Sequence, residues 1–93
     1  MPETYFKVRW PDESRSYCYS PSSTIKDALR LNHPYPLAEF VSLSRAALEH
    51  GSARVAQKYG FGCGHALAQI REIEARATDF PADAIITVES FDP

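Results

Sequence analysis

Two short runs near the N-terminus follow the alternation of apolar and polar side chains that is typical of half-buried β-strands. One strand-like run covers residues 5–10, and a second covers residues 15–20. Residues 11–14 lie between them and supply proline, aspartate and serine, which favour turns. The pattern therefore predicts an N-terminal β-hairpin, and it leaves open which face of the second strand is buried.

Two blocks in the middle of the chain, residues 36–59 and 63–77, carry apolar residues at every third or fourth position. This spacing predicts two amphipathic helices. Pro36 is expected at the first helical position, where its missing N–H costs no hydrogen bond. Gly60 is expected to end the first helix in the left-handed conformation. Gly51 is expected to bend or break that helix, because glycine costs about 1 kcal/mol relative to alanine in a helix interior.

The apolar stripe of the second block identifies the side that should be buried. Its members are Cys63, Ala66, Leu67, Ile70, Ile73, Ala77 and Phe80. Charged residues, including Glu72 and Arg76 at the favourable i, i+4 spacing, are expected to face water.

The remaining segments complete the expected fold. Residues 25–31 have room for a short helix inside a proline-interrupted connector, and residues 84–91 are rich in β-branched and aromatic side chains, which favours a closing strand. We expect a single α+β domain, residues 1–93, in the order ββ(α)ααβ. In it a three-stranded sheet, made of the hairpin and the C-terminal strand, packs on a helical hairpin.

Composition and charge exclude several classes of protein. The chain has 93 residues, 44% of them hydrophobic, and a net charge of -2, so it offers no overall attraction to a phosphate backbone. Its longest apolar runs are three residues long, where a membrane span needs about 20. No signal-peptide pattern is present at the N-terminus, so we expect a cytoplasmic protein with two reduced thiols.

Cys63 is the first candidate for chemistry. It is expected at the start of a helix, where free amides stabilise a thiolate, and His65 follows two residues later. Cys63 also belongs to the apolar stripe, so burial as a small hydrophobic residue is the favoured interpretation. The alternative is a small thiol-dependent or metal-dependent enzyme that uses Cys63 with His65 or Cys18.

A zinc site would have to draw on Cys18, His33, Cys63 and His65. The spacing of these residues does not support one, because no Cys-x-x-Cys or His-x-x-x-His pair brings two ligands together locally. We expect no bound metal and no cofactor.

The polar face of the first strand is the most informative surface. Tyr5, Lys7 and Arg9 share that face, and Tyr19, or Tyr17, of the second strand can join them. Tyrosine and arginine are enriched where proteins bind one another, so a protein partner or a homodimer is one interpretation. Aromatic and basic side chains on an open sheet also bind single-stranded RNA, and an unused solvated face is a third possibility.

Several short segments together resemble a small bacterial family of nitrogen starvation response proteins. The matching segments are Arg9-Trp10-Pro11-Asp12, Cys18-Tyr19-Ser20-Pro21-Ser22, Tyr35-Pro36-Leu37-Ala38-Glu39-Phe40, Ser44-Arg45, Arg54-Val55 and Lys58-Tyr59-Gly60-Phe61-x-Cys63. The resemblance implies a gene cluster that also encodes a nitrilase, and it carries no catalytic assignment. It makes us expect a non-enzymatic accessory or binding protein in a nitrogen-starvation or nitrile-related pathway. Cys18 and Cys63 fit the family pattern, whereas the chain departs from it around His33 and His65.

Overall fold

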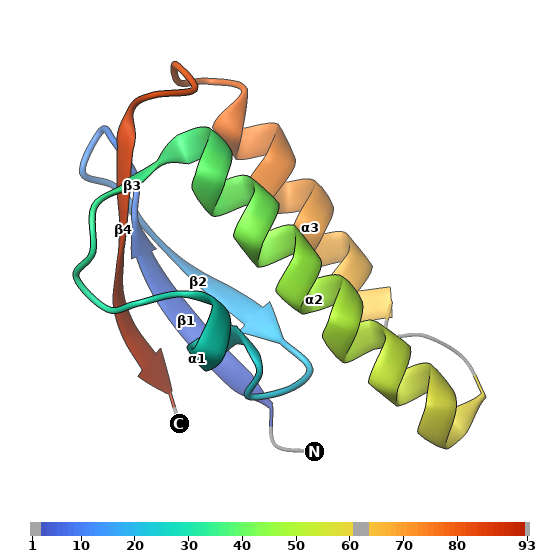
Figure 1. The fold of residues 1–93 in the computed structure, drawn as a ribbon. Helices are drawn as coiled ribbons and strands as arrows, with labels where there is room; N and C mark the ends of the chain where they lie inside the picture. Colours follow the sequence, from blue (N-terminus) through green and yellow to red (C-terminus); the bar gives the residue numbers. More distant parts are fainter. Residues whose placement is uncertain (1–2, 61–63, 93) are drawn as a thin grey trace.

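A four-stranded antiparallel sheet and a pair of long helices form two layers in the computed structural model, which describes residues 3–60 and 64–92 (Figure 1). The elements are β1 (Thr4–Arg9), β2 (Arg15–Ser20), α1 (Ile25–Ala28), β3 (Tyr35–Pro36), α2 (Leu37–Tyr59), α3 (Gly64–Ala77) and β4 (Ile85–Asp92). The strand order is β2-β1-β4-β3, so β4 inserts between the hairpin and β3. The α+β class, the hairpin, the helical pair and the closing strand are confirmed.

The prediction of three strands was wrong, because β3 adds a fourth. It consists of Tyr35 and Pro36, which pair with Ile86 and Ile85 of β4. A two-residue strand that contains proline has no alternation to detect, and its partner lies about fifty positions further along the chain.

Helix α2 runs without interruption from Leu37 to Tyr59, so the predicted bend or break at Gly51 does not occur. The glycine serves close packing instead: a Cβ at Gly51 would lie 2.9 Å from Cγ of Pro21. Pro36 precedes the helix as its N-cap and is not its first residue. Gly60 ends the helix with φ 86° and an N–H···O bond of 2.8 Å to Ala56, as predicted.

The core lies between the sheet and the two long helices. Its largest fully buried apolar side chains are Phe6, Val8, Ile25, Leu29, Leu37, Phe40, Leu48, Ile86 and Val88. Burying a side chain of this size contributes roughly 1.5–3 kcal/mol. Trp10 closes one end of the core, where its ring stacks on Phe80 and meets Phe40 edge-to-face.

The apolar stripe of α3 differs from the predicted one at two positions. Ala66, Ile70 and Ile73 are buried as expected, but Leu67 is 47% exposed and Gln69 is buried in its place. The reason is that α3 lies along the outer edge of β2, where a backbone N–H needs an acceptor and an apolar side chain supplies none. None of the helices formed by the described residues combines the length and the apolar character that spanning a bilayer requires.

Candidate functional site

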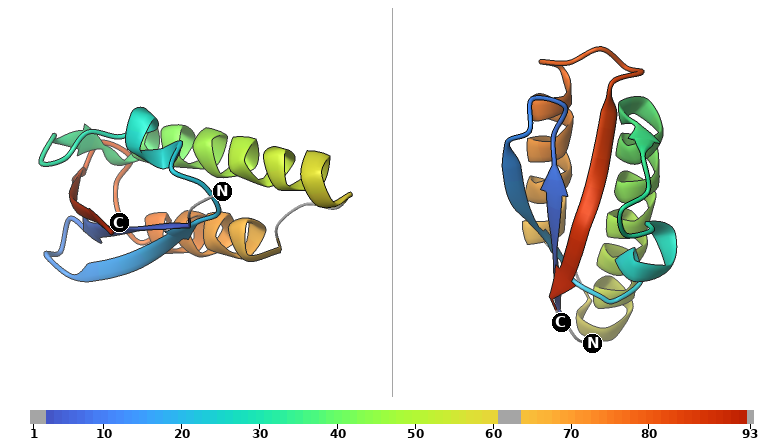
Figure 2. Two further views of the ribbon diagram at one scale, coloured as in Figure 1. Left: turned by 90° about the horizontal axis from the view of Figure 1, so that it is seen from below. Right: turned by 90° about the vertical axis from the view of Figure 1, so that its left-hand side faces the viewer.

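The hairpin strands leave one face of the sheet open. Figure 2 (right) looks onto β2, β1 and β4, with α2 and α3 behind them. Buried Cys18 shows that the even-numbered side of β2 faces the helices, so Tyr17 and Tyr19 lie on the open side. The antiparallel register then places six outward side chains in three opposed pairs, Tyr5 with Tyr19, Lys7 with Tyr17 and Arg9 with Arg15. We call these six residues the hairpin face.

The hairpin face is cationic. Strands β1 and β2 contribute Lys7, Arg9 and Arg15 and contain no carboxylate. One carboxylate reaches them from β4, since Glu89 lies 2.8 Å from Nε of Arg15 and 3.8 Å from a terminal nitrogen of Arg9. The hydrogen bond from Arg15 is the main reason why the pKa of Glu89 is lowered, and the nearby positive charges act in the same direction. Glu89 therefore stays ionised and offsets part of the positive charge.

The tyrosines of the hairpin face differ in how far they project. Tyr17 is 66% exposed, and the ammonium group of Lys7 lies 5.8 Å from the centre of its ring. Tyr5 is 43% exposed and meets the ring of Tyr19 edge-to-face, with the centroids 5.7 Å apart. Ring pairs of this kind contribute about 0.5–1.5 kcal/mol beyond the area they bury. The face thus presents aromatic surface whose orientation is already set.

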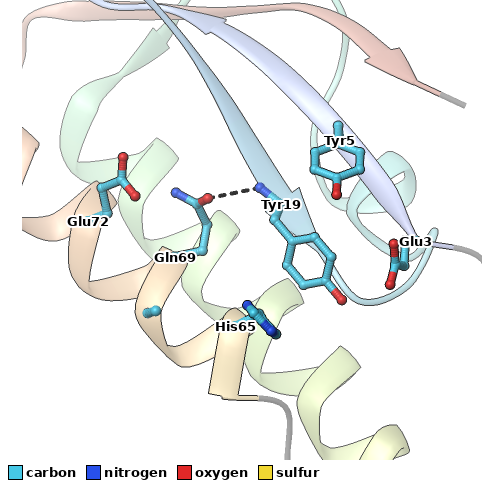
Figure 3. Close-up of a pocket in the computed structure, with 7 residues that line it drawn as sticks. Glu3, Tyr5, Tyr19, His65, Gln69 and Glu72 are labelled. Carbon is cyan, nitrogen blue, oxygen red and sulfur yellow. Dashed lines mark hydrogen bonds between the residues drawn. The ribbon is translucent and has the colours of Figure 1, made fainter.

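A pocket opens where the hairpin meets α3 (Figure 3). Its volume is about 360 Å³, and its lining residues are Glu3, Tyr5, Tyr19, His65, Ala68, Gln69 and Glu72. The backbone N–H of Tyr19 donates to Oε1 of Gln69 over 2.9 Å, which fixes the edge of β2 against the helix. His65, in the first turn of α3, brings its ring centroid to 5.9 Å from that of Tyr19. Two strands and one helix therefore hold the walls of the pocket.

The predicted thiol residues are placed as follows. Cys63 lies outside the described residues, so its environment is not part of the site geometry. Cys18 is 1% exposed, and burial, with a smaller contribution from Glu72, raises the pKa of its thiol to about 12. A thiol of that pKa is protonated at neutral pH and is not a nucleophile. His65 faces Tyr19, as the pocket geometry shows.

The residues considered as candidate metal ligands do not come together in the part of the chain that is described. Residues 3–60 and 64–92 contain no group of three or more histidine, cysteine, aspartate or glutamate side chains arranged to hold an ion. His33 instead packs its ring against Tyr35, with the centroids 4.5 Å apart.

Sequence reasoning found four of the six residues of the hairpin face and named Tyr17 as an alternative to Tyr19. It missed Arg15. It also missed Gln69 of α3, which accepts the hydrogen bond from Tyr19, and Glu89 of β4, which pairs with Arg15. Arg15 had a signal, because it shares the odd-numbered side of β2 with the tyrosines. Glu89 had none, since it sits at a shift in register between β1 and β4 near Lys7 and Val8.

The residues that match a known family cover almost all of the site described above. A family model described as "Nitrogen starvation-induced protein NitG" matches residues 5–91. The chain belongs to the NitG family. The matched segment includes the whole hairpin face, Glu89 and every lining residue of the pocket except Glu3. No curated protein and no solved structure matches the chain.

Proposed function

We propose that this NitG family member is a non-enzymatic binding protein that acts during nitrogen starvation and holds an acidic protein partner on its hairpin face. One observation carries the proposal: three tyrosines and three cations, two of them paired with Glu89, share the face of the sheet that α2 and α3 do not cover, on a chain whose net charge is -2 (Figure 2). Tyrosine and arginine are the side chains that most often supply binding energy in protein interfaces.

The arrangement of the tyrosines supports a protein interface. The ring of Tyr5 rests against Tyr19, and Tyr17 lies beside Lys7. Immobilising a flexible side chain on binding costs roughly 0.5–1.5 kcal/mol, so rings that are already oriented lower the cost of association. The positive charge of the face would then steer an acidic partner towards it.

The charges favour a protein over RNA. Glu89 is bonded to Arg15 and lies close to Arg9, which leaves Lys7 as the cation of the face outside these ion pairs. RNA affinity depends mainly on cations that neutralise phosphates, and the net negative charge of the chain opposes a polyanion. A homodimer through this face is also disfavoured, because two copies would bring like charges together.

Location and partner belong to the same proposal. We infer a cytoplasmic protein, and the products of the nitrilase-containing gene cluster that the family resemblance implies are the first candidates for the partner. An acidic surface on one of those proteins is the property to look for.

Affinity capture from nitrogen-starved cells tests the proposal. Three baits are compared: the unmodified chain, the double variant Lys7→Glu/Arg9→Glu, and a control. The control is the double variant Arg54→Glu/Arg71→Glu, which makes the same change in charge on the helical layer. Lys7→Glu alone is a further bait, since it leaves both ion pairs of Glu89 in place. The emission of Trp10, which is buried and is the only tryptophan, reports whether each bait is folded.

We expect an acidic protein to be retained by the unmodified chain and by the control, and to be lost from both Lys7 variants. Purified partner should then bind the unmodified chain directly, with an affinity that falls as salt is added. Equal retention by all baits would refute the role of the hairpin face. Loss of capture after nuclease treatment would identify RNA as the ligand instead.

A further inference from the structure

The pocket beside the hairpin face has a chemistry of its own. Among the described residues it is lined by two tyrosine rings, one histidine, one glutamine, one alanine and two carboxylates, and by no lysine or arginine. The adjoining hairpin face carries the opposite charge. The pocket and the face therefore select different ligands.

The two carboxylates stand on either side of the rings. In Figure 3, Glu3 lies beside Tyr5, and Glu72 lies at the far end of the pocket on α3. Neither forms an ion pair with a residue of the described ranges, whereas Glu49, Glu74 and Glu89 each hold an arginine. Carboxylates that form no ion pair within the described residues, on either side of aromatic rings, create a site of negative potential.

The rings add a second attraction for positive charge. The face of an aromatic ring attracts a cation that lies within about 6 Å of its centre, and ammonium groups bind in aromatic pockets for this reason. Tyr5 and Tyr19 come from neighbouring strands and meet at an interplanar angle of 66°, so they form two walls of a corner. His65 closes a third side, and the bond from Tyr19 to Gln69 keeps the corner in place.

The size of the pocket limits the ligand. Its volume of about 360 Å³ lies near the lower end of the range of about 300–1,000 Å³ that small-molecule sites occupy. A compact molecule fits, and a folded chain does not. We propose that this pocket binds a small organic ammonium ion, whose charge is shared between the tyrosine rings and the two carboxylates.

The inference does not depend on the proposed function. A partner protein on the hairpin face and a small cation in the pocket use opposite charges, and only Tyr5 and Tyr19 are common to both surfaces. Reversing Lys7 and Arg9 should abolish partner capture and leave cation binding intact or slightly stronger. The failure of one proposal therefore leaves the other standing.

Choline and its uncharged carbon isostere, 3,3-dimethylbutan-1-ol, are the matched probes. Each is titrated into ¹⁵N-labelled protein while the backbone amide signals are followed. We expect choline to cause saturable shifts of Tyr5, Tyr19, His65 and Gln69, and the isostere to bind at least about tenfold more weakly because it has no charge. Equal shifts from both probes, or choline shifts spread evenly over all acidic residues, would overturn the proposal.

Variants assign the effect to the pocket. Tyr5→Leu and Glu72→Gln change groups that are partly open to solvent, and each should weaken choline binding by about three- to tenfold. Tyr17→Leu, on the same sheet face but outside the pocket, should leave the affinity unchanged. If Tyr17→Leu weakens binding as much as Tyr5→Leu does, or if neither pocket variant has an effect, the site lies elsewhere and the proposal is wrong. Trp10 emission confirms that every variant is folded.

Discussion

The backbone N–H of Tyr19 donates a hydrogen bond of 2.9 Å to the side-chain oxygen of Gln69. Strand β2 lies at one edge of the sheet, so this bond supplies an acceptor on the side where β2 has no neighbouring strand. Because Tyr19 belongs both to the hairpin face and to the pocket, the bond also fixes the position of the two surfaces relative to α3.

Replacing the acceptor should destabilise this edge. Gln69→Leu leaves the Tyr19 N–H without its partner, and we expect a loss of about 1–3 kcal/mol in the free energy of unfolding. Urea titration followed by Trp10 emission measures the loss, and hydrogen exchange at the Tyr19 amide should accelerate. Leu67→Gln is the control, because an exposed position nearby should change stability by no more than about 0.5 kcal/mol. An unchanged midpoint for Gln69→Leu would show that the bond is dispensable.

Gly51 should not tolerate a side chain, although it lies within a helix. The added Cβ of Gly51→Ala would be 2.9 Å from Cγ of Pro21 and 3.1 Å from Oγ of Ser22. Overpacking of this kind costs about 1–3 kcal/mol, which exceeds the roughly 1 kcal/mol that alanine gains over glycine in a helix. We therefore expect Gly51→Ala to lower the thermal unfolding midpoint.

Gly64 provides the matched control for that substitution. It is the first residue of α3, and a Cβ there would meet no atom of the described residues beyond its chain neighbours within 4 Å. Gly64→Ala should leave the midpoint unchanged or raise it, by up to about 1 kcal/mol of stability. An unchanged or raised midpoint for Gly51→Ala would contradict the close packing of α2 on Pro21.

The buried thiol should make stability depend on alkaline pH. The pKa of Cys18 rises from its ordinary value of 9.0 to about 12 in the folded chain. Between these values the unfolded chain loses the proton and the folded chain keeps it, so the free energy of unfolding falls as pH rises. The slope from this group alone is at most about 1.4 kcal/mol per pH unit, and it fades as the pH falls through the ordinary pKa of 9.0.

The comparison of Cys18→Ala with the unmodified chain isolates that contribution. Urea unfolding at about pH 8 and about pH 10 should give a smaller pH-dependent loss for Cys18→Ala, because the group that titrates has been removed. In a Cys63→Ser background, the Cys18 thiol should also react with a thiol reagent only after unfolding. Rapid labelling of the native chain would show that Cys18 is accessible.

Glu89 should weaken partner binding, because it neutralises part of the hairpin face. Glu89→Gln removes the charge that holds Arg15 and Arg9, so we expect faster association with an acidic partner and a stronger dependence on salt. Glu74→Gln is the control, since it breaks a similar ion pair, with Arg45, on the helical layer. Surface plasmon resonance at two salt concentrations compares the rates. Slower association of Glu89→Gln would mean that the carboxylate itself contacts the partner.

The sequence was sufficient to predict the elements whose signal is local. The hairpin, both long helices and the closing strand follow from periodicity within short windows. β3 could not be predicted, since it consists of two residues that become a strand only by pairing with β4. The burial of Gln69 on α3, where burial of Leu67 was predicted, also depends on a distant element, the edge of β2.

The candidate site divides in the same way. Alternation along β1 was enough to place Tyr5, Lys7 and Arg9 on one face, and the burial of Cys18 then decides the side of β2. The pocket required the packing of α3 against the hairpin, which no local pattern encodes. The burial of Gln69 and the position of Glu89 likewise depend on contacts between residues that are at least fifty positions apart.

A charge-swap titration decides whether the hairpin face binds the partner. Calorimetry measures three affinities. The purified partner is titrated into the unmodified chain and into Lys7→Glu. A partner in which one acidic residue has been changed to lysine is then titrated into Lys7→Glu. We expect Lys7→Glu to lose about tenfold or more in affinity and the swapped pair to recover most of it, which corresponds to a coupling of at least about 1 kcal/mol. Unaltered affinity for Lys7→Glu, with no recovery from any swap, would show that the partner binds elsewhere.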